Sequence, residues 1–352
     1  MSQSPPPTLS LSWRMASATI MGVTGIISRS FLYGLNSVEV TGLSRFLEIL
    51  ETRKDPEKRK RGLLTVSNHV SVLDDPVVWG LLPLSQAFDP TNLRWTLGAH
   101  DICFANPLFA AFFNYGQVLP THRLKHSVHG GPFQPAVTQA IRLLSRQSSV
   151  YPPFYTTNGT DRVPTPAVHA RNRHAWVHVF PEGLVHQHPS SDLRYFKWGV
   201  ARLILEADPA PDVLPMFIDG TQNVMPEDRT FPRFAPRIGK RIRVAFGDVL
   251  DYEATFGDLK RRWDALVRRS RPGSGSLGEL DDDDLKFGRE AEMIRIEVAR
   301  RMREEVLKVR GAMGGFPESD PKLGEAGTWA VDEGIKQKKY KSRVDGSDIN
   351  QD

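Results

Sequence analysis

Short apolar runs alternate with amphipathic segments along most of the chain. The apolar runs are rich in β-branched and aromatic residues and end in polar residues, which is typical of buried strands. Several segments between them repeat apolar residues at helical spacing, which predicts helices. We therefore expect strands within residues 62–67, 94–99, 116–119, 176–180, 213–218 and 242–246, and helices within 74–82, 107–115, 135–145, 199–207 and 257–271.

This alternation predicts an α/β fold in which helices flank a central mixed sheet. The main domain is expected to span residues 51–271. Within it, residues 147–173 are rich in Pro, Asn, Gly, Thr and His and have neither helical nor strand periodicity. They are therefore predicted to form an inserted loop.

The two ends of the chain depart from the alternating pattern. Residues 1–50 are expected to form a membrane-associating segment, because residues 1–38 contain no Asp or Glu, as in many mitochondrial-type leaders. The uncharged run 15–28 is shorter than the roughly 18 to 20 residues of a spanning helix, so an interfacial segment fits better. An apolar helix packed on the domain is the alternative. Residues 272–310 predict a flexible link and a charged surface helix, and 311–352 a disordered tail.

Composition and charge narrow the classes of function only partly. The 352 residues carry a formal charge of +5 and are 40% apolar, which suits a globular domain with appendages. The basic balance favours an anionic surface and leaves nucleic acid and acidic membrane open at this point.

Cysteine and histidine usage argues against a metal centre. The single cysteine, Cys103, excludes an internal disulfide and a multi-cysteine metal site. It lies in an apolar run, where core packing is favoured over a role as nucleophile. His186 and His188 alternate, but no nearby acids or thiols complete a site, so no metal is expected.

A histidine and an aspartate follow the first predicted strand at a spacing that chemistry can use. His69 stands at the strand end, and Asp74 follows five positions later at a predicted helix start. Neutral imidazole can take the proton of an attacking hydroxyl, and a carboxylate on the other ring nitrogen orients it. The pair therefore suggests a general base for acyl transfer to an alcohol. Taken alone, the spacing also arises by chance, and a structural histidine is then the commoner explanation.

A second motif, Phe180-Pro181-Glu182-Gly183, follows the strand predicted at 176–180. A carboxylate can hold a glycerol hydroxyl or orient Arg and His side chains. Glycine lets backbone amides approach an oxyanion or a phosphate closely. Without the first motif, this sequence would be an ordinary turn.

Together, the two motifs resemble those of the glycerolipid acyltransferase superfamily, which pairs a His-x-x-x-x-Asp block with a Phe-Pro-Glu-Gly block. The flanking residues, from roughly 38 to 250, are similar to the tafazzin family. The similar stretches include Trp79-Gly80, Arg94-Trp95-Thr96, Phe112-Phe113, 194–204, 223–226 and 231–234. This resemblance implies a coenzyme A-independent phospholipid–lysophospholipid transacylase that remodels cardiolipin acyl chains and uses no cofactor. The alternative is an acyl-CoA-dependent lysophospholipid acyltransferase with the same His69 and Asp74 chemistry.

The resemblance also implies roles for residues outside the His69/Asp74 pair. Arg123 stands where the superfamily has an arginine for the substrate phosphate, and Glu182 and Gly183 would bind the glycerol phosphate part. Asn68, beside His69, is placed with these substrate-binding residues. One departure is that Leu184 replaces the basic residue often found after the second motif.

The implied substrates, which are phospholipids, cardiolipin and monolysocardiolipin, are insoluble, so transfer between them must occur at a membrane surface. The resemblance implies a mitochondrial protein, peripheral or monotopic on the inner or outer membrane and facing the intermembrane space, with no nucleic-acid partner. A buried helix and strand is the alternative for the apolar stretch 199–218. Basic clusters at 58–61 and 260–271 are further candidates for headgroup contact. The residues expected to contact the membrane are Ile20, Val23, Ile26, Leu203 and Leu205.

Overall fold

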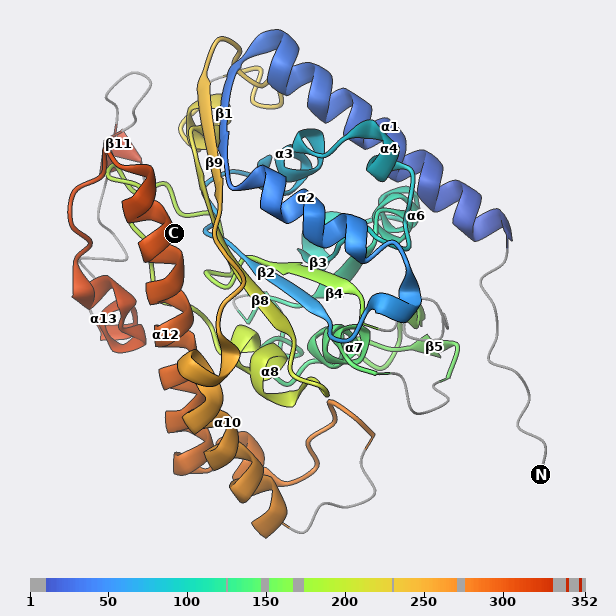
Figure 1. The fold of residues 1–352 in the computed structure, drawn as a ribbon, viewed down its shortest axis with the longest axis vertical. Helices are drawn as coiled ribbons and strands as arrows, with labels where there is room; N and C mark the ends of the chain where they lie inside the picture. Colours follow the sequence, from blue (N-terminus) through green and yellow to red (C-terminus); the bar gives the residue numbers. More distant parts are fainter. Residues whose placement is uncertain are drawn as a thin grey trace.

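A seven-stranded mixed sheet with helices on both faces forms the centre of the molecule, as the sequence predicted (Figure 1). The computed structural model describes residues 11–331 except 125, 147–151, 167–173, 230 and 271–275, and also 340–341 and 348–349. The strand order is β1-β9-β8-β2-β7-β3-β4, and only β8 and β9 pair antiparallel. The strands are β1 (Ser37–Thr41), β2 (Leu63–Val66), β3 (Trp95–Ala99), β4 (Val118–Thr121), β7 (Trp176–Val179), β8 (Asp212–Asp219) and β9 (Arg241–Phe246).

Helices cover the two faces of this sheet in separate groups. The group that includes α1, α2 and α3 lies on one face, and the group that includes α7, α8, α10 and α12 lies on the other (Figure 1). The helices are α1 (Leu11–Leu35), α2 (Leu43–Thr52), α3 (Asp74–Leu81), α4 (Leu84–Ala87), α5 (His100–Cys103), α6 (Pro107–Tyr115), α7 (Pro135–Leu144), α8 (Gly199–Glu206), α9 (Thr221–Val224), α10 (Tyr252–Arg269), α11 (Asp283–Phe287), α12 (Arg289–Met313) and α13 (Ala326–Val331), with 3-10 turns η1 (Pro56–Lys58) and η3 (Pro321–Gly324).

The central strands are buried on both faces, which explains why their sequences read as continuous apolar runs. Successive side chains of a strand point to opposite faces. In β2, Leu63 therefore joins the core beneath α2 and α3, and Leu64 joins the core beneath α7 and α8. β7 divides its side chains in the same way, with Trp176 on the first face and Val177 on the second.

Two elements near the N-terminus were not predicted. β1 is an edge strand paired with β9, and its burial alternates along the strand, so it lacks the continuous apolar run of the central strands. α2 follows directly and buries only Phe46 and Leu50. The alternating burial of β1 and the two buried residues of α2 are too short as patterns to predict these elements from the sequence.

Helix α1 combines the two alternatives considered for the N-terminal segment. Met21 and Leu32 are buried, and the Arg29 guanidinium donates to the carbonyls of Gly80 and Leu82 at the end of α3. Other side chains of α1 are exposed, among them Val23 (47%). Among the described residues, α1 is the one helix long and apolar enough to cross a membrane by length and composition.

The C-terminal part belongs to the core, which corrects the predicted boundaries. α12 buries Val298, Met302 and Val306 on the sheet, so it is not simply a charged surface helix. It continues to Met313, and Leu323 in η3 is also buried. The disordered tail predicted from residue 311 therefore cannot begin before 331, and most residues after that lie outside those described.

The prediction of membrane contact at Leu203 and Leu205 is wrong. α8 carries both residues, whose exposed fractions are 0% and 2%, and packs them into the core with α7 and α12. The apolar stretch 199–218 is instead the buried helix and strand that was given as the alternative. Of the predicted inserted loop 147–173, residues 152–166 are described, and they contain a short hairpin of β5 (Phe154–Tyr155) and β6 (Val163–Pro164). A small pair of strands, β10 (Tyr340–Lys341) and β11 (Asp348–Ile349), is also described.

Candidate active site

Three strand ends meet at one place on the sheet. β2 lies between β7 and β8 and is parallel to both, with Val66 opposite Val179 and Pro215. Parallel strands that are neighbours in a sheet end at the same edge, where α/β proteins commonly bind ligands. The segments that follow the three strands therefore bring His69, Glu182 and Thr221 together, although they are far apart in the sequence.

His69 and Asp74 form the pair predicted from their spacing. Nδ1 of His69 lies 2.9 Å from Oδ2 of Asp74, whose side chain is fully buried. The same oxygen accepts the main-chain N–H groups of Val70 and Ser71 at 2.7 and 2.8 Å, so the loop folds around the carboxylate. Asp74 also begins α3, where the positive end of the helix favours a negative charge.

The outer side of the His69 ring remains available for chemistry. The side chain is 21% exposed, and its ring stacks on Phe180 with a centroid separation of 4.4 Å. No described residue forms a hydrogen bond with Nε2 of His69. An imidazole held in this way, with a carboxylate on Nδ1, can accept a proton from a hydroxyl at Nε2.

Thr221 is a third member of this arrangement that the sequence analysis missed. Its hydroxyl donates to Oδ1 of Asp74 at 2.5 Å, so both carboxylate oxygens have partners. The preceding Gly220 has φ of 96°, and a Cβ there would lie 2.0 Å from the Arg241 carbonyl oxygen, so the turn requires glycine. The only sequence signal was a Gly-Thr pair after a buried strand.

Glu182 has a different position from the one predicted for it. It is buried (1% exposed), and its two oxygens accept the main-chain N–H groups of His69 and Arg194 at 2.9 and 3.3 Å. Burial raises the pKa of Glu182 to about 7, although both hydrogen bonds act in the opposite direction. Glu182 therefore connects the two motifs rather than facing a substrate, which corrects its predicted role.

Asn68 is also structural, against the prediction of substrate binding. It is fully buried, its amide nitrogen donates to the carbonyl of Ile218, and its amide oxygen accepts the N–H of the same residue, both at 2.8 Å. These two bonds join the end of β2 to β8. Both amide atoms therefore have main-chain partners, and the side chain has no exposed surface.

Positive charges lie beside the second motif. Gly183 has φ of +68°, and a Cβ there would lie 2.7 Å from Nζ of Lys197. Desolvation, followed by the charges of Arg194 and Arg123, lowers the pKa of Lys197 to about 8. Lys197 thus supplies a cation near the position where Leu184 departs from the superfamily. In the sequence, Lys197 lies within the family-like stretch 194–204, where no motif marks it as a site residue.

Arg123 lies at the edge of this positive cluster. Its guanidinium forms an ion pair with Asp101, and both side chains are about a third exposed. A partly exposed pair of this kind contributes little to stability, so exchanging the carboxylate for a phosphate has a low energetic cost. The structure therefore places Arg123 where an anionic headgroup can reach it.

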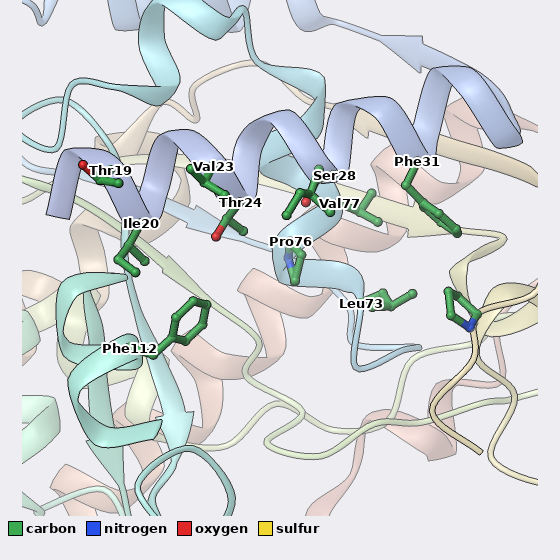
Figure 2. Close-up of a pocket in the computed structure, with 12 residues that line it drawn as sticks. Thr19, Ile20, Val23, Thr24, Ser28, Phe31, Leu73, Pro76, Val77 and Phe112 are labelled. Atoms are coloured by element: carbon green, nitrogen blue, oxygen red, sulfur yellow. The ribbon is translucent and has the colours of Figure 1, made fainter. Parts of the chain in front are cut away.

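An apolar groove of about 590 Å³ begins beside Asp74 (Figure 2). Leu73, Pro76 and Val77 from the start of α3 form one wall. The opposite wall is α1, and Phe112 of α6 lies at one end. The lining from α1 comprises Thr19, Ile20, Val23, Thr24, Ile27, Ser28 and Phe31. Two of the predicted membrane-contacting residues, Ile20 and Val23, thus line the groove, which has the shape and chemistry to hold a hydrocarbon chain.

Two other reactive side chains near the site are unsuited to catalysis. Burial lowers the pKa of His178 to about 3, so this histidine is neutral, and it bonds to the Thr65 hydroxyl at 2.7 Å. Burial raises the pKa of Cys103 to about 11, which disfavours a thiolate. Both residues are therefore structural.

Several known proteins are similar in sequence to this chain over most of its length. Residues 38–219 match the family model described as Acyltransferase. The chain is 35% identical to the tafazzin of Saccharomyces cerevisiae over 335 residues, which cover 92% of this chain and 85% of that protein. It is 32% identical over 253 residues to the tafazzin of Drosophila melanogaster, covering 71% of this chain and 55% of that protein.

The 1-acyl-sn-glycerophosphate acyltransferase of Thermotoga maritima aligns with a TM-score of 0.40 and 17% identity, covering 72% of this chain and 77% of that one.

We predict that Thr221→Val lowers kcat about tenfold and leaves KM nearly unchanged, because Asp74 loses a hydrogen bond worth about 1.5 kcal/mol to a charged group. Thr221→Ser keeps the donor and serves as the control. A wild-type kcat in Thr221→Val would show that Thr221 does not position Asp74.

A second prediction follows from the raised pKa of Glu182. Between pH 4.5 and about 7 the folded state keeps a proton that the unfolded state releases, so the free energy of unfolding falls by about 3 kcal/mol as pH rises through this window. Glu182→Gln should lack this contribution, whereas Glu253→Gln, at an exposed position on α10, should retain it. Denaturant unfolding at several pH values measures the difference. Identical pH dependence in Glu182→Gln and wild type would contradict the assignment.

Proposed function

This chain belongs to the tafazzin branch of the acyltransferase family, and we propose that it moves fatty acyl groups between phospholipids without coenzyme A. The resemblance seen in the motifs is confirmed by the 35% identity to the yeast tafazzin over 92% of this chain. The chain is therefore an acyltransferase acting in phospholipid metabolism. The observation that supports acyl transfer is the His69/Asp74 pair, whose histidine is partly exposed to solvent and whose loop borders an apolar groove. The choice of a phospholipid donor over acyl-CoA rests on the similarity to the tafazzins.

The proposed reaction is a direct transfer between two lipids. Nε2 of His69 takes the proton of the free hydroxyl of a lysophospholipid while that oxygen attacks the ester carbonyl of the donor. The tetrahedral intermediate collapses with cleavage of the donor's ester bond. The departing alkoxide then takes the proton from the imidazolium, so His69 is neutral again and Asp74 remains ionised throughout.

Recognition of the two lipids divides between charge and apolar contact. Arg123 and Lys197 would hold headgroup phosphates, since both cations lie beside the motif that follows β7. The groove along α3 would hold an acyl chain with its ester end near His69. This division needs no metal ion and no cofactor.

We also propose cardiolipin and monolysocardiolipin as substrates, and a mitochondrial membrane surface facing the intermembrane space as the place of reaction. The absence of Asp and Glu from residues 1–38, as in many mitochondrial-type leaders, supports this location. The exposed apolar side chains of α1, among them Val23 and Ile26, support attachment to a membrane.

The test is transfer of labelled acyl chains between lipids in liposomes that contain phosphatidylcholine and monolysocardiolipin, without coenzyme A. Wild type should move label into cardiolipin, and His69→Ala should lower the rate by at least about a thousandfold, because the general base is removed. Asp74→Asn should still bind liposomes but lose most turnover. Activity that appears only with acyl-CoA would replace the proposal with an acyl-CoA-dependent lysophospholipid acyltransferase. Transfer by His69→Ala at the wild-type rate would remove His69 from the mechanism.

The groove makes a separate prediction about the acyl chain. Thr24→Trp should fill the space between α1 and α3 and lower kcat/KM for long-chain donors at least about tenfold, since lost apolar contact is worth 1 to 3 kcal/mol. Short-chain donors should be affected much less. Ser30→Trp adds a similar bulk at an exposed position of α1 outside the groove, and should behave like wild type. Equal loss for all chain lengths would contradict acyl binding in the groove.

A further inference from the structure

The loop of residues 231–240, between α9 and β9, exposes three large apolar side chains. The exposed fractions of Phe231, Phe234 and Ile238 are 89%, 80% and 59%. Clustered exposure of this kind in a folded protein marks an interaction surface, because water contact with these side chains is unfavourable. We call residues 231–240 the Arg-Phe loop.

Cations alternate with these apolar residues. Residues 229–240 contain four Arg or Lys residues and no Asp or Glu. Arg229 and Arg233 donate only to main-chain carbonyls, and no described carboxylate pairs with Arg237 or Lys240. The loop therefore presents unneutralised positive charge together with phenyl groups, a combination suited to a surface with anionic headgroups over hydrocarbon.

The loop is attached to the same face as α1 and the groove. The N–H of Gly239 donates to the carbonyl of Leu35, the last residue of α1, and that of Lys240 donates to Oδ1 of Asn36, the residue after it. Pro236 lines the groove together with Leu73. The exposed apolar surface of α1 thus continues through the loop to the opening beside the catalytic loop.

We propose that the Arg-Phe loop docks on an anionic phospholipid bilayer, with Phe231 and Phe234 entering the acyl boundary and the loop's cations contacting lipid phosphates. The exposed Phe231, Phe234 and Ile238 lie in a loop that borders an apolar groove. This arrangement favours a lipid surface over a nucleic acid, because binding of nucleic-acid phosphates does not require aliphatic contacts. The docked loop places the groove opening at the bilayer surface. That last step rests on the proposed function, whereas binding of the loop to the bilayer does not.

The test is co-sedimentation of the full chain with vesicles of phosphatidylcholine, either alone or mixed with phosphatidylglycerol. Arg233→Gln with Lys240→Gln should weaken binding to the anionic vesicles roughly thirtyfold, because each cation near an anionic surface strengthens binding by a factor of roughly five. The matched control is Arg289→Gln with Lys308→Gln, which removes the same charge at exposed positions of α12, on the face of the sheet opposite α1. Binding lost equally in both double variants would overturn the proposal in favour of a net-charge effect.

A second double variant separates lipid insertion from simple charge attraction. Phe231→Ser with Phe234→Ser should weaken binding to both vesicle types several-fold, because the phenyl contribution does not depend on headgroup charge. Wild-type binding by this variant, or displacement of the vesicles by RNA at equal phosphate concentration, would overturn the proposal.

An activity measurement distinguishes this proposal from the proposed function. With short-chain phospholipids below their critical micelle concentration, no bilayer is needed, and both loop variants should keep the wild-type rate. A matching loss of that rate would instead assign the loop to the reaction itself and contradict a docking role.

Discussion

The buried carboxylate of Asp74 is the constraint on which the rest of the site depends. A charge with no exposure to water is tolerated only when hydrogen bonds replace its solvation. Asp74 receives four, from the ring of His69, two main-chain N–H groups of its own loop, and the hydroxyl of Thr221. Satisfying this one charge determines the shape of the loop, the orientation of the histidine and the position of the turn after β8.

A second buried carboxylate, Glu182, connects this arrangement to the neighbouring strand. Its hydrogen bonds to the main chain of His69 and Arg194 join the loop after β2 to the segment after β7. Polar chemistry is thus concentrated at the strand ends, and the apolar groove lies directly on the other side of α3's first turn. Substrates with a charged head and a hydrocarbon tail match this division.

The C-terminal helix supports the site from outside the region that matches the family model. Arg303 and Arg310 of α12 are buried, and within the segment 190–194 they donate to four carbonyls, those of Leu193, Arg194, Ser191 and Ser190. Asp192 in the same segment accepts the hydroxyl of Ser319 and the N–H of Asp320. The segment that carries Lys197 and follows the second motif is therefore held by residues more than a hundred positions away.

The sequence by itself determined the central strands, most of the helices and the His69/Asp74 pair, because each depends on local periodicity or on a short spacing within one loop. The roles of Asn68 and Glu182, the contribution of Thr221 and the burial of Leu203 and Leu205 depended on which strand lies beside which. The sequence pattern of an apolar face is the same whether the face packs on a core or on a membrane. The identity of a polar residue likewise does not show whether its partner is a substrate or a main-chain amide. Only the tertiary structure, by supplying the neighbour, decided between them.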